Sequence, residues 1–371
     1  MPNKQVIPFF SKRPTAVSKR QSEYYPPAIE IGSASLKLLQ IARTKKTLEI
    51  SKAAYYPLNA HLPSAIPRDV RNAFKEFIKD NQIKGKIVTS LPINKIQTFT
   101  FTLSNMPESE IASAVAWKLK QNLPAGTNFA NLSVECIPCL SRQDDVNKDI
   151  RVLVFVVTKE VVMEYITLFR EFSLEPIAVE PKPYATLRAL LLCGKISKDE
   201  TVIVLQLGSA QSAMTIVHLG QPYLIRSLPV AGNIFTEVIT QHHQLDWQKA
   251  EAFKKQEGLK AYHHPNESTL LPALASQLEN LLIDIEHTFK YFSHQLMKLQ
   301  VTSFNRIILC GGSAALPNLD KFLSDRLEAP VEVFRPFDSP NLSPGQELNL
   351  LVTENSASFA SVLGLAARDI E

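Results

Sequence analysis

Three short segments place glycine and serine directly after an apolar run, a pattern suited to binding an anion. The first is Ile29–Lys37, in which a Gly-Ser-Ala-Ser turn joins one predicted strand to the next. Comparable junctions occur at Leu205–Ser209 and Ile308–Ser313. Glycine lets the backbone approach a ligand closely, and a tight turn can direct backbone N–H groups and hydroxyls at a phosphate. The chemistry that these segments predict is therefore anion binding.

Glycine is scarce in the rest of the chain, which gives these junctions weight. The chain has 12 glycines in 371 residues, and the junctions or the nearby Ala231-Gly232 account for Gly32, Gly208, Gly232, Gly311 and Gly312. A glycine-poor chain that places its glycines after apolar strands needs unusual backbone there. For each junction taken alone, an ordinary turn between strands remains the alternative.

The motifs of several enzyme classes are absent. The sequence has no P-loop, no Gly-x-Gly-x-x-Gly, no His-Glu-x-x-His and no Gly-x-Ser-x-Gly. Cys136 and Cys139 have the spacing of a redox dithiol, but they follow a predicted strand and not the helix N-terminus that would activate a thiol. No second cysteine pair completes a zinc site. Nucleophilic, redox and metal chemistry therefore have no local support.

The net charge of +4 is concentrated at the N-terminus. Residues 1–25 carry five basic residues against Glu23 alone, so the remainder is neutral, which argues against a broad nucleic-acid surface. We expect this tail, which includes Phe9-Phe10, to be a disordered arm, with weak contact to anionic lipid as the alternative. No apolar run is long enough for a membrane span or a secretory signal, so cytoplasm is the expected location.

Hydrophobic periodicity predicts an alternation of strands and helices that positions the junctions. Strands are expected on both sides of each glycine turn, and a β-α-β-β-α order over residues 93–175 indicates a ferredoxin-like module. Helices are expected at Arg68–Asp80, Glu108–Leu123, Val161–Phe172, Tyr184–Leu192, Phe235–Gln241, Trp247–Gln256, Leu319–Leu327, about 356–367, and along an apolar stripe from Leu278 to Leu299. The predicted organisation is a disordered basic tail (1–26), a first lobe (27–92, with 176–198 returning to it), an inserted ferredoxin-like subdomain (93–175), and a second lobe (199–371) with a small subdomain at about 234–300.

Two glycine hairpins followed by a Gly-Gly strand end resemble the actin-like ATPase fold, an α/β, ribonuclease H-like fold of two lobes. In that fold, two related hairpins clasp the nucleotide phosphates and a Gly-Gly loop lies against the adenosine. More closely, the sequence resembles the PilM family of type IV pilus assembly proteins, relatives of the cell-division protein FtsA. The resemblance runs from about Ala28 to Arg368 and is carried by Ile29–Lys37, Met106–Ile111, Arg151–Val157, Ile177–Glu180, Leu228–Asn233, Ala250–Lys254, Ile307–Leu319 and Leu363–Arg368.

The resemblance implies ATP and Mg²⁺ as ligands and assigns each site residue a role. Phosphate contacts would come from Gly32, Ser33, Ser35 and Lys37 in the first turn and from Gln206, Gly208, Ser209 and Ser212 in the second. The adenosine would lie against Gly311, Gly312 and Ser313. Glu30 would hold Mg²⁺ through water.

One departure from the family pattern bears on catalysis. Gln206 stands where the second phosphate motif normally has Asp, and a neutral amide cannot supply the negative charge that a hard cation favours. We therefore expect nucleotide binding with weak or absent hydrolysis, and the chain's status as an enzyme stays open.

The resemblance also implies a place in the cell. It indicates a cytoplasmic scaffold of a type IV pilus or type II secretion-like machine, peripheral to the inner membrane, which binds the short N-terminal peptide of a PilN-like inner-membrane protein. One alternative is a sugar kinase-like phosphotransferase, which would need a catalytic Asp where Gln206 stands. Another is an FtsA-like filament-forming protein, which would carry an amphipathic membrane helix after the last core helix.

Overall fold

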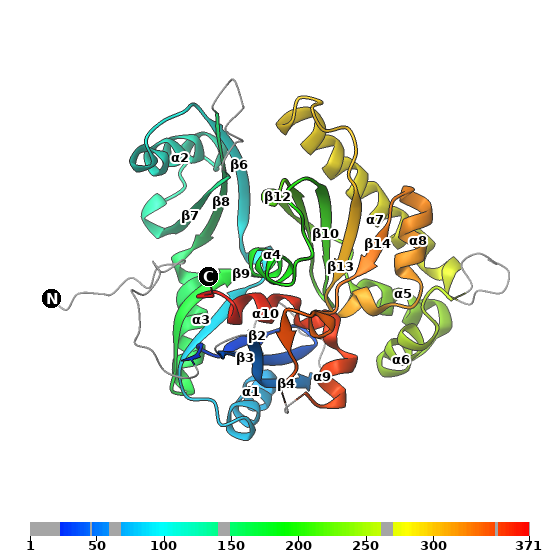
Figure 1. Cartoon of the computed structure of the whole chain (residues 1–371). Coiled ribbons are helices and arrows are strands. Elements are labelled where there is room, and N and C mark those ends of the chain that lie inside the picture. The colour runs from blue at the N-terminus through cyan, green and yellow to red at the C-terminus, as the bar shows by residue number, and fades with distance from the viewer. Residues whose placement is uncertain are drawn as a thin grey trace.

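The computed structural model describes residues 23–44, 47–58, 68–139, 149–260, 270–345 and 348–370, which form three β-sheets and the helices around them (Figure 1). Residues 1–22 of the predicted tail lie outside these ranges. The end of that tail differs from the expectation, because β1 (Glu23–Tyr24) pairs antiparallel with β3 and Tyr25 is buried. Strand pairing is therefore present a few residues before the predicted boundary at 26. None of the helices in the described ranges combines the length and apolarity needed to cross a bilayer.

The first lobe is built on a mixed sheet whose strand order is β15-β4-β3-β2-β5-β9. Its hairpin strands run antiparallel, while β5 and β9 are added in parallel. Aromatic side chains of α1 (Arg68–Asp80) and α3 (Lys159–Glu171) pack against one face of the sheet, with Phe74 and Phe169 in edge-to-face contact. The strands are β2 (Ala28–Ile31), β3 (Ser35–Arg43), β4 (Leu48–Pro57), β5 (Gly85–Leu91), β9 (Leu174–Pro181) and β15 (Leu342–Ser343).

The second lobe repeats this arrangement. Its sheet has the order β12-β11-β10-β13-β14. Strand β10 lies between its hairpin partner β11 and the parallel strand β13, as β2 in the first lobe lies between β3 and β5. The strands are β10 (Thr201–Leu207), β11 (Ser212–His218), β12 (Gln221–Leu228), β13 (Arg306–Cys310) and β14 (Val331–Val333). The helices of this lobe are α5 (Gly232–His243), α6 (Trp247–Glu257), α7 (Leu271–Tyr291) and α8 (Leu319–Leu327).

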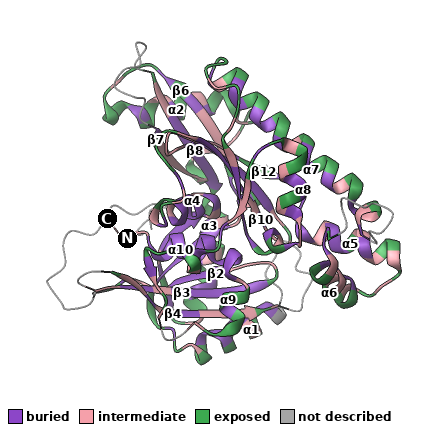
Figure 2. Cartoon of the chain, turned by 45° about the vertical axis from the view of Figure 1, so that its right-hand side comes forward, coloured by how far each residue is buried: buried purple, intermediate pink, exposed green. Residues whose placement is uncertain are grey.

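Strand β10 shows why its sequence suits a buried central strand. Successive side chains point to opposite faces of a sheet, and here both faces are covered. Val202 and Val204 pack toward α4 (Lys182–Leu192) and α10 (Ala360–Ala366), whereas Ile203 and Leu205 pack toward the helices of the second lobe. Helices α4 and α10 therefore lie in one core shared by the two lobes (Figure 2).

The two central helices cross at close range. A Cβ atom on Gly364 of α10 would lie 1.6 Å from the carbonyl oxygen of Ala185 on α4. Only glycine fits there without moving one helix, because backbone and Cβ would overlap. The crossing is reinforced by Arg188, whose guanidinium donates to the Gly364 carbonyl and to buried Glu180, each at 2.8 Å.

The inserted subdomain carries a sheet of its own. β6 (Gln97–Leu103), β7 (Leu132–Cys139) and β8 (Ile150–Thr158) form an antiparallel sheet in the order β6-β8-β7, with α2 (Glu108–Asn122) packed on one face. The following strand, β9, pairs with β5 in the first lobe and does not join this sheet. The β-α-β-β-α order agrees with the predicted ferredoxin-like module, but only three of its strands share one sheet.

The C-terminal segment departs from its expected place in the second lobe (199–371). β15 pairs in parallel with β4 of the first lobe, and α10 packs on α4 and against β2 and β3. A further short helix, α9 (Leu350–Glu354), contacts β4. The physical reason is burial: Leu363, Leu365 and Phe359 are apolar and are fully covered only between the two lobes. The chain thus returns to the first lobe after β14.

Candidate functional site

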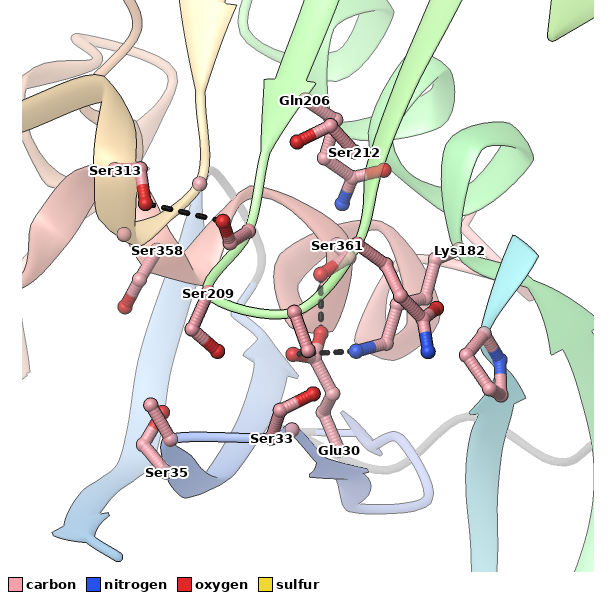
Figure 3. A pocket seen from close by; sticks show the side chains of 18 of the residues that line it. Glu30, Ser33, Ser35, Lys182, Gln206, Ser209, Ser212, Ser313, Ser358 and Ser361 are labelled. Atoms are coloured by element: carbon pink, nitrogen blue, oxygen red, sulfur yellow. Dashed lines mark hydrogen bonds and ion pairs between the residues drawn. The ribbon is translucent and has the colours of Figure 1, made fainter. Parts of the chain in front are cut away.

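A single cavity of about 820 Å³ brings the three glycine junctions together. This volume lies in the range of small-molecule sites, about 300–1,000 Å³. The cavity is bordered by the β2–β3 turn of the first lobe and by the β10–β11 turn and the end of β13 from the second (Figure 3). Every residue predicted to contact nucleotide or metal lines it: Glu30, Gly32, Ser33, Ser35, Lys37, Gln206, Gly208, Ser209, Ser212, Gly311, Gly312 and Ser313.

The two hairpin turns have the same geometry. In each, a glycine N–H donates to the carbonyl of the residue three positions later: Gly32 to Ser35 at 2.9 Å and Gly208 to Gln211 at 3.0 Å. A Cβ atom at either glycine would approach that carbonyl oxygen to 2.8 Å and 2.4 Å, respectively. Glycine is therefore required to close these turns, and the small residues that follow keep their N–H and hydroxyl groups at the edge of the cavity.

The third junction requires glycine for a different reason. Gly311 has φ of 92°, in the left-handed region that side chains disfavour, and a Cβ there would lie 2.3 Å from the Leu207 carbonyl oxygen. This approach places the end of β13 directly beside β10. Gly312 differs, because a Cβ at that position would meet nothing within 4 Å. Gly311 is thus fixed by packing, whereas Gly312 leaves room in the cavity.

Hydrogen bonds fix the segments of the second lobe that border the cavity. The N–H groups of Gly232 and Asn233, at the start of α5, donate to the carbonyls of Gly208 and Ser209 at 2.9 and 2.6 Å. The hydroxyl of Ser313 also donates to the Gly208 carbonyl, at 3.0 Å. The β10–β11 turn is therefore tied by hydrogen bonds to both α5 and the Gly-Gly loop.

Glu30 is the centre of a buried ion-pair cluster at the base of the first turn. Its Oε1 accepts from Lys37 Nζ at 2.7 Å and from Lys182 Nζ at 3.2 Å, and its Oε2 accepts from the hydroxyl of Ser361 (Figure 3). Burial opposes ionisation of Glu30, but the charges of Lys182 and Lys37 outweigh it and lower the pKa of Glu30 from 4.5 to about 2. Burial also lowers the pKa of Lys182, which Glu30 opposes.

These contacts do not fit the Mg²⁺ role expected for Glu30. Both of its carboxylate oxygens already accept from cationic or hydroxyl donors, and hard divalent cations are bound by available anionic oxygens. Lys37, expected at a phosphate, donates to Glu30. Gln206, at the end of β10, contributes a neutral amide. Within the described ranges, no group of three or more His, Cys, Asp and Glu residues could hold a metal.

A second cationic cluster borders the cavity from α5 and α6. Lys254 is buried, and its Nζ donates to the Gly232 carbonyl at 3.0 Å, to Thr236 Oγ1 at 2.7 Å and to Glu251 at 2.5 Å. Burial raises the pKa of Glu251, but Lys254 and Thr236 outweigh this effect, and the net shift is downward. These residues hold the start of α5 against the cavity wall.

Several lining residues were not identified from the sequence. Lys182 and Ser361 come from α4 and α10, and no motif spacing links them to the first glycine turn. Glu251 and Lys254 lie within the segment 250–254 that carried the family resemblance, so the sequence contained a pattern that could have pointed to them. The resemblance of that segment marks the fold and assigns no role in the site to these two side chains.

One orphaned polar atom points toward a ligand. The hydroxyl of Ser212 is buried, borders the cavity, and has no hydrogen-bond partner within the described part of the chain. A buried hydroxyl without a partner is costly, so such groups are usually satisfied by a ligand or ordered water. Ser212 therefore fits the expected role of a hydrogen-bond donor in the second turn.

The Cys136–Cys139 pair has no activated thiol. Both residues lie on β7, and burial raises the pKa of each to about 11. A redox dithiol needs a lowered thiol pKa. The surroundings of the two thiols on β7 therefore do not activate them as a redox dithiol requires.

Comparisons with known proteins place the chain in a family. A model of the family described as type IV pilus assembly protein PilM matches residues 28–370. A structure described as a PilM–PilN type IV pilus biogenesis complex has 22% sequence identity and a TM-score of 0.76, and the match covers 94% of this chain and 99% of that one. Ethanolamine utilization protein EutJ from Carboxydothermus hydrogenoformans has 13% identity and a TM-score of 0.51, with 93% and 89% covered. Together with the repeated sheet order of the two lobes, these likenesses confirm the predicted actin-like fold.

Proposed function

Since the chain belongs to the PilM family of type IV pilus assembly proteins, we propose that it is a cytoplasmic, actin-like scaffold that holds ATP between its two lobes. The observation that carries the nucleotide proposal is the single cavity, to which both hairpin turns and the Gly-Gly loop contribute. Because these segments come from different lobes, a ligand that contacts all of them favours one arrangement of the lobes over others.

The two ends of the cavity suit the two ends of a nucleotide. The turns at 32–35 and 208–212 offer N–H groups, hydroxyls and the nearby Lys182 to the phosphates. The adenosine then lies along Gly312, where the backbone leaves open space, and beside Glu251 and Lys254 of α6. In this arrangement Lys182 lies at the phosphate end and Gly312 leaves space for the adenosine.

A substitution at Gly312 tests this placement. Gly312→Leu adds a side chain where a Cβ meets no atom within 4 Å, so the fold is retained while the adenosine space is filled. We expect ATP binding, measured by isothermal titration calorimetry, to fall at least about tenfold, the equivalent of ~1.4 kcal/mol. Ala275→Leu, at an exposed position on α7 in the same lobe, is the matched control and should leave the affinity unchanged. Equal affinities for the two variants would contradict the placement.

We also propose that hydrolysis is weak or absent, because Gln206 supplies no carboxylate beside the phosphates. The same feature disfavours the sugar kinase-like alternative, which requires a catalytic Asp there. Phosphate release should be near background for the wild-type protein and should rise in Gln206→Asp. Rapid, sugar-dependent ADP formation by the wild-type protein would instead support a phosphotransferase.

A PilN-like inner-membrane protein is the proposed partner. The family assignment and the likeness to a PilM–PilN complex support this proposal, and binding through a short N-terminal peptide is its finer form. Such a partner would place the chain peripherally at the inner membrane of a pilus or type II secretion-like machine. The test is fluorescence anisotropy with a labelled peptide of the residues that precede the transmembrane helix of the PilN-like protein from the same genome. A scrambled peptide is the control, and equal binding of both would contradict the proposal.

A further inference from the structure

The charges that border the cavity are dominated by lysine. Lys37, Lys95, Lys182, Lys254 and Lys255 line it, against the glutamates at positions 30, 251 and 354, and no aspartate does so within the described ranges. A polyphosphate needs its negative charge balanced when it leaves water. In a site whose Glu30 and Glu251 carboxylates are already paired with lysines, side-chain ammonium groups can supply that balance in place of a divalent cation.

The carboxylates of Glu30 and Glu251 are both already paired with lysines. Glu30 is shared by two lysines, Lys37 at 2.7 Å and Lys182 at 3.2 Å. Glu251 is likewise shared by Lys254 at 2.5 Å and Lys255 at 3.3 Å. Each glutamate therefore balances only one of its two lysines, and each cluster retains a net positive charge toward the cavity.

Of the two lysines paired with Glu30, Lys182 is the better placed to contact a phosphate. Its side chain is 19% exposed, whereas that of Lys37 is 7% exposed and holds the shorter contact to Glu30. Lys182 is the first residue of α4, so its side chain enters the cavity from the shared core beside the first glycine turn (Figure 3). Lys37 can keep Glu30 paired while Lys182 donates to a ligand.

We propose that this site binds ATP without Mg²⁺, with the ammonium group of Lys182 taking the place of the cation at the phosphates. The inference rests on the proposed ATP-binding function. It explains why Gln206 is tolerated at the end of β10: with Lys182 beside the phosphates, no carboxylate is needed there to hold an ion through water. An uncharged amide also leaves the phosphates free of repulsion.

Calorimetric titration of the full-length protein with ATP, in excess Mg²⁺ and in excess EDTA, tests this directly. We expect binding in EDTA to be at least as tight as in Mg²⁺, because free ATP carries more negative charge than its Mg²⁺ complex and the site is cationic. Binding at least tenfold weaker in EDTA would overturn the inference while leaving ATP binding intact. No binding in either buffer would overturn both the inference and the ATP-binding proposal.

Two variants identify the residues responsible. Lys182→Met should weaken ATP binding in EDTA about tenfold or more, because a charge-assisted hydrogen bond is lost. Lys86→Met, at an exposed position on β5 outside the cavity, is the matched control for net charge and should change binding less than about twofold. Gln206→Asp should make binding depend on Mg²⁺, with about tenfold weaker binding in EDTA than in Mg²⁺. Identical behaviour of Lys182→Met and Lys86→Met, or a Gln206→Asp variant insensitive to EDTA, would refute the assignment.

Discussion

Glu30 gives the sharpest prediction about stability, because its environment is both buried and charged. Glu30→Gln keeps the volume of the side chain and can still accept from Lys37 and Ser361, but it removes the negative charge between two lysines. The perturbation therefore isolates the electrostatic part of the cluster. Removing one partner of a buried pair leaves the other charge uncompensated, which is among the more costly single changes in a protein.

The lowered pKa of Glu30 sets the magnitude. A pKa shifted from 4.5 in the unfolded chain to about 2 in the folded protein corresponds to about 3 kcal/mol at pH 7. Since the folded pKa is the lower one, this stabilisation is present above pH 4.5 and is lost as the pH falls toward 2. About 1 kcal/mol of it should remain at pH 3.

Urea unfolding of the nucleotide-free protein, followed by circular dichroism, measures these differences. Glu30→Gln should lower the free energy of unfolding by about 3 kcal/mol at pH 7 and by less than half as much at pH 3. Glu171→Gln is the control, because it breaks the Arg71–Glu171 pair, whose side chains are 45% and 42% exposed, and should cost less than about 1 kcal/mol. A loss below about 1 kcal/mol for Glu30→Gln at pH 7, or a loss that does not shrink with acid, would refute the reasoning.

Three other features give predictions of their own. Gly364→Ala should lower the free energy of unfolding by about 1–3 kcal/mol or more, because the new Cβ would overlap the Ala185 carbonyl. A thermal melt that matches the wild type would contradict the close crossing of α4 and α10. Thr98→Val and Thr100→Val, which remove hydroxyl donors at 2.6 and 2.8 Å from the Ile225 and Tyr223 carbonyls, should each cost about 1 kcal/mol and speed hydrogen exchange in β6 and β12. Cys136, with a thiol pKa raised from 9.0 to about 11, should react with iodoacetamide at pH 8 about 100-fold more slowly than an unperturbed thiol, and a rate equal to that of free cysteine would show that the thiol is not buried as described.

Local features of the chain were readable in advance because their causes are local. The turns at 32–35 and 208–211 need glycine because a Cβ atom at that position would lie less than 3 Å from a carbonyl oxygen. In the sequence this requirement appears as a glycine after an apolar strand. Helices α1 and α8 begin and end at the predicted residues, Arg68–Asp80 and Leu319–Leu327, because apolar residues recur at the helical period. The short strands β14 and β15 were missed, since runs of two or three residues carry no detectable period.

Burial and pairing were decided only by the tertiary structure. The sequence alone indicated that Glu30 lies in a strand directly before a glycine turn suited to binding an anion. It did not determine that Lys182 from α4 and Ser361 from α10, 331 positions away from Glu30, would occupy both carboxylate oxygens. Electrostatic partners are set by distance in space and by exclusion of water, and neither quantity is written in the spacing of residues along a chain. For that reason the convergence of the glycine junctions on one cavity was predictable, whereas the charge that borders the cavity was not.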